Sequence, residues 1–299
     1  MTKNKNHKAF SLIEISMVIL VIGILIAGIS QGIDLYDDYR LASARNLTKN
    51  SLVNRIPDLE MWLETTGENS LATGTTSFTD KPNPADQDSI GRWNNINPNI
   101  LPSARNHATQ NNPTASVDNQ PKYIRKGMNG LPVLKFDGTN DFFSYNGNFL
   151  VGADYTIFVV EARGKGGQNV FIAGNTNDTN KMLLLGYNSD NSIIQTHYYT
   201  DTYKTIPRFV STISRMHSFV FSKTSGKAIY NNDVTVKFDT EKTSPLISYA
   251  GSSIGNFFNG YSYYQGHIAE IIFYTRALTD KERQGVETYL SKKWGIKLG

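Results

Sequence analysis

The chain has 299 residues, which suggests about two structural units, and 39% of them are hydrophobic, as in an ordinary globular protein. It contains no cysteine, so disulfides, cysteine-ligated metal sites and thiol catalysis are excluded. The formal net charge is +4, but Lys3, Lys5 and Lys8 supply three of those charges. The rest of the chain is nearly neutral, which argues against nucleic acid as a partner.

The N-terminal region holds one long apolar run. Residues 10–33 carry a single charged side chain, Glu14, and as a helix they would extend roughly 36 Å, enough to cross a hydrocarbon core of about 30 Å. The residues before the run are basic and those after it are acidic, so we expect the N-terminus in the cytoplasm and the body exported. No proline follows until Pro57, and we expect one helix from about Ser11 to Arg55.

Both the nature of this segment and the presence of Glu14 near its start need an explanation. A secretory signal also has a basic start and an apolar core, but this run is longer and its helical pattern continues without a cleavage site. A carboxylate inside a membrane segment usually has a partner. Ser11 and Glu14 have the spacing of a capping box, which is one way to satisfy the carboxylate.

The sequence KAFSLIE at residues 8–14 resembles the leader and methylation motif of type IV prepilins and type II secretion pseudopilins. The resemblance implies cleavage between Ala9 and Phe10 by a prepilin peptidase, and methylation of Phe10. It also implies that Glu14 pairs with the Phe10 ammonium of a neighbouring subunit. Gly28 and Gly32 have the small-xxx-small spacing that lets helices pack closely. Ala9 departs from the glycine usual in this family, and the mid-helix proline of many pilins is absent.

After Pro57 the chain changes to short β-rich runs with turn residues between them, a pattern typical of a sandwich or jelly roll. Residues 65–88 are polar and are expected to form an irregular loop. A short C-terminal helix is expected to begin at a capping box of Thr279 and Glu282 and to end at Gly295. The runs expected to form strands are residues 131–136, 155–162, 170–173, 182–187, 193–199, 217–221, 227–230, 234–238 and 267–274.

Several short segments, in order along the chain, resemble the laminin G-like jelly roll of the concanavalin A-like lectin/glucanase superfamily. They include IGRW at residues 90–93, GLPVLKFDG at 130–138, GHIAEII at 266–272 and KWG at 293–295. The resemblance covers about residues 58–299 and implies a domain that binds glycans or proteins, often with calcium. The fold by itself says little about the ligand.

Patterns for catalysis are weak. A glucanase of this superfamily needs paired carboxylates in an E-x-D-x-x-E strand, and no such pattern occurs. Glu270 stands alone, so we expect it to have a structural role, either capping a loop or pairing with a basic residue. GSSIG at residues 251–255 matches a nucleophile elbow, but the β-like sequence after it favours a sandwich strand. The five histidines have no metal-ligand spacing. We expect no enzyme.

Two loops are candidate binding sites in the body. Asp137, Asn140 and Asp141 follow a strand and offer oxygen atoms for calcium, although a hydrogen-bonded turn is favoured. Beyond calcium, no cofactor is expected. Tyr261, Tyr263 and Tyr264 lie between Gly260 and Gly266 in a predicted loop, where they could stack on a sugar or contact a protein.

These observations predict three segments: a leader over residues 1–9, an assembly and transmembrane helix over 10–56, and a laminin G-like β-sandwich head over 57–299. We expect a type IV pilin-like structural subunit, a minor or tip pilin whose head recognises a glycan or surface protein. The alternatives are a type II secretion pseudopilin, a filament-forming major pilin and a membrane-anchored carbohydrate-active enzyme. The expected location is the bacterial inner membrane, followed by an extracellular pilus or a periplasmic pseudopilus of many subunits.

Overall fold

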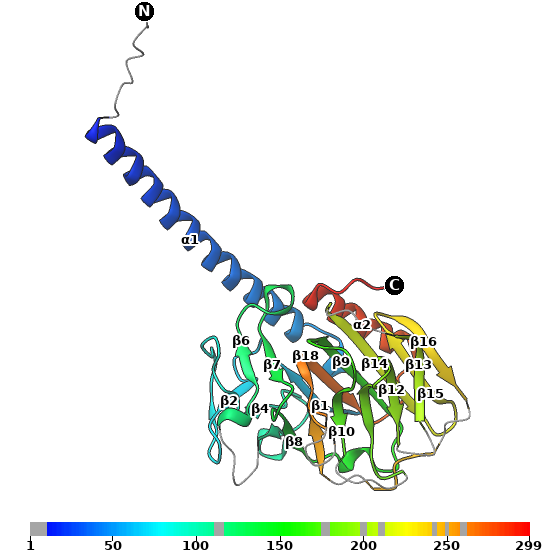
Figure 1. Cartoon of the computed structure of the whole chain (residues 1–299). Coiled ribbons are helices and arrows are strands. Elements are labelled where there is room, and N and C mark those ends of the chain that lie inside the picture. Colours follow the sequence, from blue (N-terminus) through cyan, green and yellow to red (C-terminus); the bar gives the residue numbers. More distant parts are fainter. Residues whose placement is uncertain are drawn as a thin grey trace, which may run out of the picture. The chain divides into compact units, whose positions relative to one another are not determined.

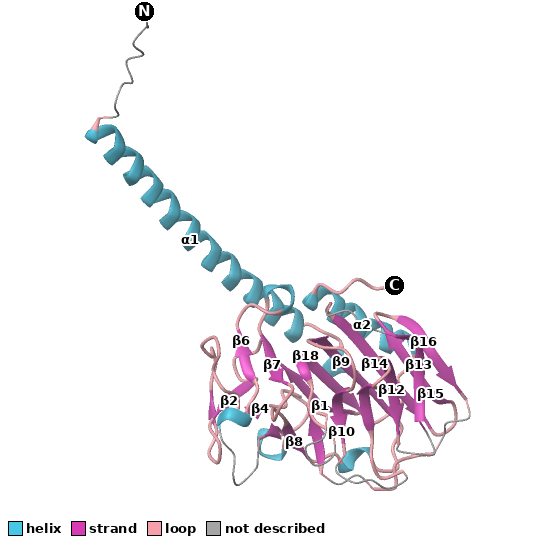
Figure 2. Ribbon diagram, viewed as in Figure 1, coloured by secondary structure: helices cyan, strands magenta, loops and turns pink. Residues whose placement is uncertain are grey.

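The computed structural model describes residues 11–110, 117–174, 180–197, 202–208, 213–240, 244–248, 251–257 and 262–299 (Figures 1 and 2). The chain divides into two compact units, residues 1–43 and 44–299. The predicted processing residues Ala9 and Phe10, and Tyr261 in the predicted binding loop, lie outside the described residues.

The first helix, α1 (Leu12–Lys49), is long and apolar enough over its first part to cross a membrane. It ends at Lys49 rather than at the expected Arg55. The Asn50 side chain competes for backbone hydrogen bonds at this point, since it donates to the carbonyl of Asn46. A 3-10 turn over Val53–Arg55 then brings Val53 into the core.

Two antiparallel sheets form the second unit. In the first sheet, the described strands run in the order β16-β15-β14-β9-β18-β7-β6, and β1 also pairs with β18. β7 pairs with the first half of β18 and β1 with the second half. The strands are β1 (Leu59–Glu64), β6 (Lys122–Ile124), β7 (Val133–Asp137), β9 (Tyr155–Arg163), β14 (Arg215–Ser222), β15 (Gly226–Asn231), β16 (Val234–Asp239) and β18 (Gln265–Tyr274).

The second sheet has the order β13-β12-β11-β10-β17-β8-β5-β4-β2-β3 among the described strands. Two short strands lie within residues 65–88, where the sequence indicated only a loop. The strands are β2 (Leu71–Thr73), β3 (Thr79–Asp80), β4 (Arg92–Trp93), β5 (Ala108–Thr109), β8 (Phe143–Tyr145), β10 (Asn169–Ala173), β11 (Leu184–Tyr187), β12 (Ser192–Thr196), β13 (Thr202–Arg208) and β17 (Ser252–Ile254).

The first sheet is covered on both faces. On β9, Ile157 and Val159 face the core between the sheets, whereas Phe158 and Val160 join a second apolar cluster with the C-terminal helix α2 (Asp280–Trp294). This double burial explains why β9 is apolar nearly throughout rather than alternating. Figure 2 shows α2 beside the first sheet.

The fold-class prediction is confirmed: a long N-terminal helix, a two-sheet antiparallel sandwich and a short C-terminal helix. All nine runs predicted to be strands overlap an observed strand, and the GSSIG segment contains β17. The predicted capping box of Thr279 and Glu282 is present. Gly295 ends α2 with φ 66°, a left-handed conformation that favours glycine.

Candidate functional site

At the start of α1, Glu14 makes the capping contact that the sequence offered as one explanation. Its Oε2 accepts a hydrogen bond from the Ser11 N–H at 2.8 Å, and the Ser11 hydroxyl accepts from the Ile13 N–H at 3.2 Å. The Glu14 side chain is exposed. A Cβ atom added at Gly28 or Gly32 would meet nothing within 4 Å, so both glycines leave open space beside the helix.

The three residues considered for calcium form a hydrogen-bonded turn after β7. Oδ1 of Asp137 accepts from the N–H groups of Thr139 and Asn140, and Oδ2 of Asp141 accepts from the Asp137 N–H at 2.8 Å. Burial, followed by the neighbouring charge of Asp137, raises the pKa of Asp141 to about 7. Within the described residues no group of three or more histidine or acidic side chains could hold a metal ion.

The predicted binding tyrosines differ in exposure. Tyr263 is partly exposed, and its ring centroid lies 6.4 Å from that of Phe142. Tyr264 is 0% exposed, so its prediction as a surface binding residue is wrong. Ser262, at φ 55°, turns the chain inward just before β18. The ring of Tyr264 packs edge-on against Phe136 in the core.

Tyr264 belongs to a buried polar cluster centred on Glu161 of β9. The carboxylate of Glu161 accepts hydrogen bonds from the hydroxyls of Tyr264 (2.6 Å) and Tyr187 (2.7 Å), and His217 Nε2 lies 3.0 Å away. Burial alone would raise the pKa of Glu161, but these contacts outweigh it and lower the pKa. The sequence analysis did not single out Glu161, although a charged residue inside an apolar strand was a usable signal.

A second buried cluster joins four elements. Lys293 Nζ of α2 lies 2.9 Å from Glu64 Oε2 of β1 and 3.0 Å from Glu270 Oε2 of β18, and it donates to the Thr48 hydroxyl of α1 at 2.9 Å. The expectation that Glu270 pairs with a basic residue is confirmed. Burial raises the pKa of Glu64, but the Lys293 charge and hydrogen bonds from Ser70 and Thr66 overcome this and lower it to about 2.

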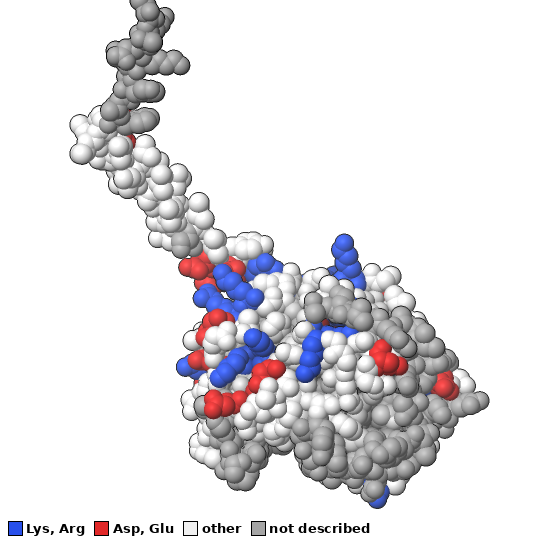
Figure 3. All heavy atoms as spheres, viewed as in Figure 1, with Lys and Arg blue, Asp and Glu red and all other residues white. Residues whose placement is uncertain are grey.

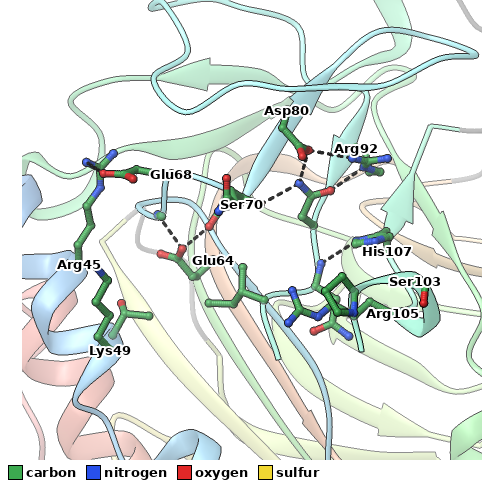
Figure 4. A pocket seen from close by; sticks show the side chains of 17 residues that line it. Arg45, Lys49, Glu64, Glu68, Ser70, Asp80, Arg92, Ser103, Arg105 and His107 are labelled. Atoms are coloured by element: carbon green, nitrogen blue, oxygen red, sulfur yellow. Dashed lines mark hydrogen bonds and ion pairs between the residues drawn. The ribbon is translucent and has the colours of Figure 1, made fainter. Parts of the chain in front are cut away.

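A pocket of about 830 Å³ opens beside this cluster, within the unit formed by residues 44–299. Figure 4 shows Arg45 and Lys49, from the end of α1, on one side of the pocket and Arg92, Arg105 and His107 on the other. The sequence analysis found no metal-ligand spacing among the histidines and did not recognise a pocket at His107. Its residues are scattered from 45 to 107, and only the fold brings them together.

The charged residues of the pocket are partly paired. Arg45 Nη1 lies 3.1 Å from Glu68, and Arg92 Nη2 lies 2.8 Å from Asp80. His107 Nδ1 accepts the Asn95 N–H at 3.1 Å. Burial, with the nearby charges of arginines including Arg92, lowers the pKa of His107, so its ring is neutral at pH 7. The pocket is therefore rich in hydrogen-bond donors.

No family model matches the chain, and no curated protein matches it. Among solved structures it is similar to Trypanosoma rangeli sialidase in complex with 2,3-difluorosialic acid, with a TM-score of 0.52 and 13% identity over 79% of this chain and 33% of that chain. It is also similar to the binding domain of Paraclostridial Mosquitocidal Protein 1, with a TM-score of 0.51 and 12% identity over 80% of this chain and 55% of that one. Domain 4 of AbnA, a GH43 arabinanase from Geobacillus stearothermophilus, has a TM-score of 0.49 and 14% identity over 69% of this chain and 99% of that domain.

The chain thus spans about a third of the sialidase's length and about half of the mosquitocidal binding domain. At 12–13% identity, these likenesses support the β-sandwich fold and nothing finer.

Proposed function

We propose that the protein is a type IV pilin-like structural subunit, a minor or tip pilin, whose helix packs in a filament core and whose β-sandwich head recognises a surface ligand. The observation that carries the proposal is the motif at residues 8–14 joined to an apolar run, residues 10–33, with one carboxylate, Glu14. A single acidic residue at the start of such a helix is costly in a membrane, which favours a function for it.

The contacts of Glu14 support an intermolecular role. Among the described residues, its carboxylate contacts no cation and accepts only the Ser11 N–H. Cleavage before Phe10 would create an ammonium group that can neutralise Glu14 of a neighbouring subunit when helices bundle. The apolar side chains of α1 along residues 12–29 are exposed, and the face shown in Figure 3 has almost no charge there. Gly28 and Gly32 leave room for close helix approach.

The head supports a binding role better than catalysis. Glu64 and Glu270 lie opposite each other on β1 and β18, but both carboxylates are buried and hydrogen-bonded to neighbouring side chains. Neither is open to a substrate for acid–base work. A pseudopilin of a type II secretion system shares every feature of the helix and is the alternative.

Substitution of Glu14 tests the assembly role. Glu14→Gln keeps an acceptor for the Ser11 N–H, because glutamine also completes a capping box, but it removes the charge. If the charge pairs with a neighbour, Glu14→Gln and Glu14→Val should both insert into the membrane and fail to enter filaments. Normal incorporation of Glu14→Gln would show that capping suffices and would refute the pairing role. The intact mass of filament protein should correspond to a chain that begins at methylated Phe10.

A further inference from the structure

The walls of the pocket at the end of α1 are held by paired side chains. Arg45 Nε donates to the carbonyl of Thr66 at 2.8 Å, and its two other nitrogens reach Glu68 and Asn83, each at 3.1 Å. On the opposite wall, Arg92 contacts both Asp80 and Asn94. These groups satisfy one another, so they fix the shape of the pocket before any ligand enters.

Three of the remaining polar side chains of the pocket offer donors. Within the described residues, the Lys49 ammonium has no hydrogen-bond partner, and Arg105 uses only Nε, which donates to the carbonyl of Ile100 at 3.0 Å. His107 accepts at Nδ1, which assigns the proton of its neutral ring to Nε2. A ligand that satisfies these groups must carry acceptor oxygens.

The charges of the lining favour an anion. Arg45 and Arg92 pair with Glu68 and Asp80, and the Lys293 ammonium behind the wall is shared by Glu64 and Glu270. The lining carries four cationic and three acidic side chains, and among the described residues Lys49 and Arg105 form no ion pair. A concave site with an excess of positive charge raises the local concentration of anions. The planar guanidinium of Arg105, whose Nη groups make no hydrogen bond to the described residues, matches the two oxygens of a carboxylate.

The size and composition of the pocket further restrict the chemical class of ligand that it can bind. A volume of about 830 Å³ is that of a small-molecule site and would hold one or a few sugar rings. The described lining holds no Phe, Tyr or Trp, so a neutral sugar finds only the small His107 ring to stack on. Asn69 and Ser103 line it as exposed polar side chains suited to hydroxyl groups.

We infer that this pocket binds an acidic sugar, with Arg105 holding its carboxylate and Lys49, on the opposite side, donating to another oxygen of the sugar. The rim of Asn69 and Ser103 would contact its hydroxyls. The inference rests on the proposed recognition role of the head, but not on filament assembly. It assigns the ligand to residues at the end of α1 rather than to the tyrosine loop.

The test is calorimetric titration of the full chain in detergent with glucuronate, glucose and inorganic phosphate. Glucuronate should bind about tenfold or more tightly than either of the others, because glucose lacks the charge and phosphate lacks the hydroxyls. Binding should weaken as salt is raised. Equal binding of phosphate would reduce the site to a general anion site and overturn the sugar assignment, and absence of glucuronate binding would overturn the inference entirely.

Variants locate the site. Lys49→Gln and Arg105→Gln should each weaken glucuronate binding by about tenfold or more, whereas Lys281→Gln, an exposed lysine outside the pocket lining, should leave it unchanged. Lys49 is exposed and makes no described hydrogen bond, so its variant should melt like the wild type even if Arg105→Gln does not fold. Unchanged affinity in Lys49→Gln would refute the assignment. Filament incorporation of Glu14→Gln is measured separately, so either proposal can fail without the other.

Discussion

Replacement of Lys293 by methionine isolates the charge at the centre of the buried cluster. Methionine matches the length of the lysine stem but leaves Glu64 and Glu270 without the cation that both contact. Lys293 and Glu64 are both 0% exposed, so water cannot take over the role of the ammonium. The removal of one partner from a buried ion pair typically costs about 3–5 kcal/mol.

The pKa of Glu64 expresses the same interaction as a dependence of stability on pH. Its value of about 2 in the folded chain lies below the ordinary 4.5, a difference that corresponds to roughly 3 kcal/mol. A lowered folded pKa contributes stability above the unfolded pKa and loses it as the pH falls. The wild type should therefore lose this contribution between about pH 4.5 and pH 2. Lys293→Met should lose much less over that window, because its Glu64 no longer has the ammonium to keep it ionised.

Urea unfolding of the full chain in detergent, followed by tryptophan fluorescence, measures both effects. Trp62 and Trp294 donate hydrogen bonds to Glu270, so they report directly on the cluster. Lys292→Met is the matched control, because Lys292 is the exposed neighbour on α2, and it should change stability by less than about 0.5 kcal/mol. A loss under about 1 kcal/mol for Lys293→Met at pH 7, or an equal loss at pH 3 and pH 7, would refute the reasoning.

Two further predictions concern buried polar groups of the sandwich. The raised pKa of Asp141, about 7, means that its protonated form stabilises the fold below the ordinary pKa of 3.8 and that this contribution is lost as the pH rises through 7. At pH 8, Asp141→Asn should therefore raise the free energy of unfolding by on the order of 1 kcal/mol and melt at a higher temperature than the wild type. A lower melting temperature would contradict this. Tyr264→Phe removes a donor from Glu161 and should cost about 1–3 kcal/mol in urea unfolding. Tyr263→Phe, at a partly exposed position, should cost less than about 0.5 kcal/mol, and equal losses would place both rings in the core.

The longer strands could be predicted from the sequence because their apolar residues are set by burial. Ile157 and Phe158 of β9 point to opposite faces of the sheet and are both buried, so the strand is a continuous apolar run in the sequence. The strands β2, β3, β4 and β5 could not be predicted in this way. Each has only two or three residues, and strands such as Arg92–Trp93 contain no repeating pattern. Their pairing is decided by neighbours distant in the chain, which no local window contains.

The same reason explains which site residues were missed. The capping contact of Glu14 and the turn at Asp137 could be predicted because their hydrogen bonds join residues only three or four positions apart. Lys49 and Arg105 carry no local signal, since a single charged residue usually marks a solvated face. Tyr264 misled the sequence analysis because glycines near it indicated a loop. Residues 262–264 lie outside any strand, but Tyr264 is already buried one residue before β18 begins.

The end of α1 takes part in both the buried cluster and the pocket. Thr48 accepts a hydrogen bond from Lys293, and Arg45 and Lys49 on the same helical turn line the pocket. A ligand held by Lys49 binds only when this turn is in place, so by mass action it stabilises the docked turn together with the head. Recognition by the pocket and attachment of the helix end are then coupled through three neighbouring residues, and a substitution that loosens one is expected to weaken the other. That coupling distinguishes this pocket from a binding loop at the far edge of a sandwich, where a ligand would leave the helix end unaffected.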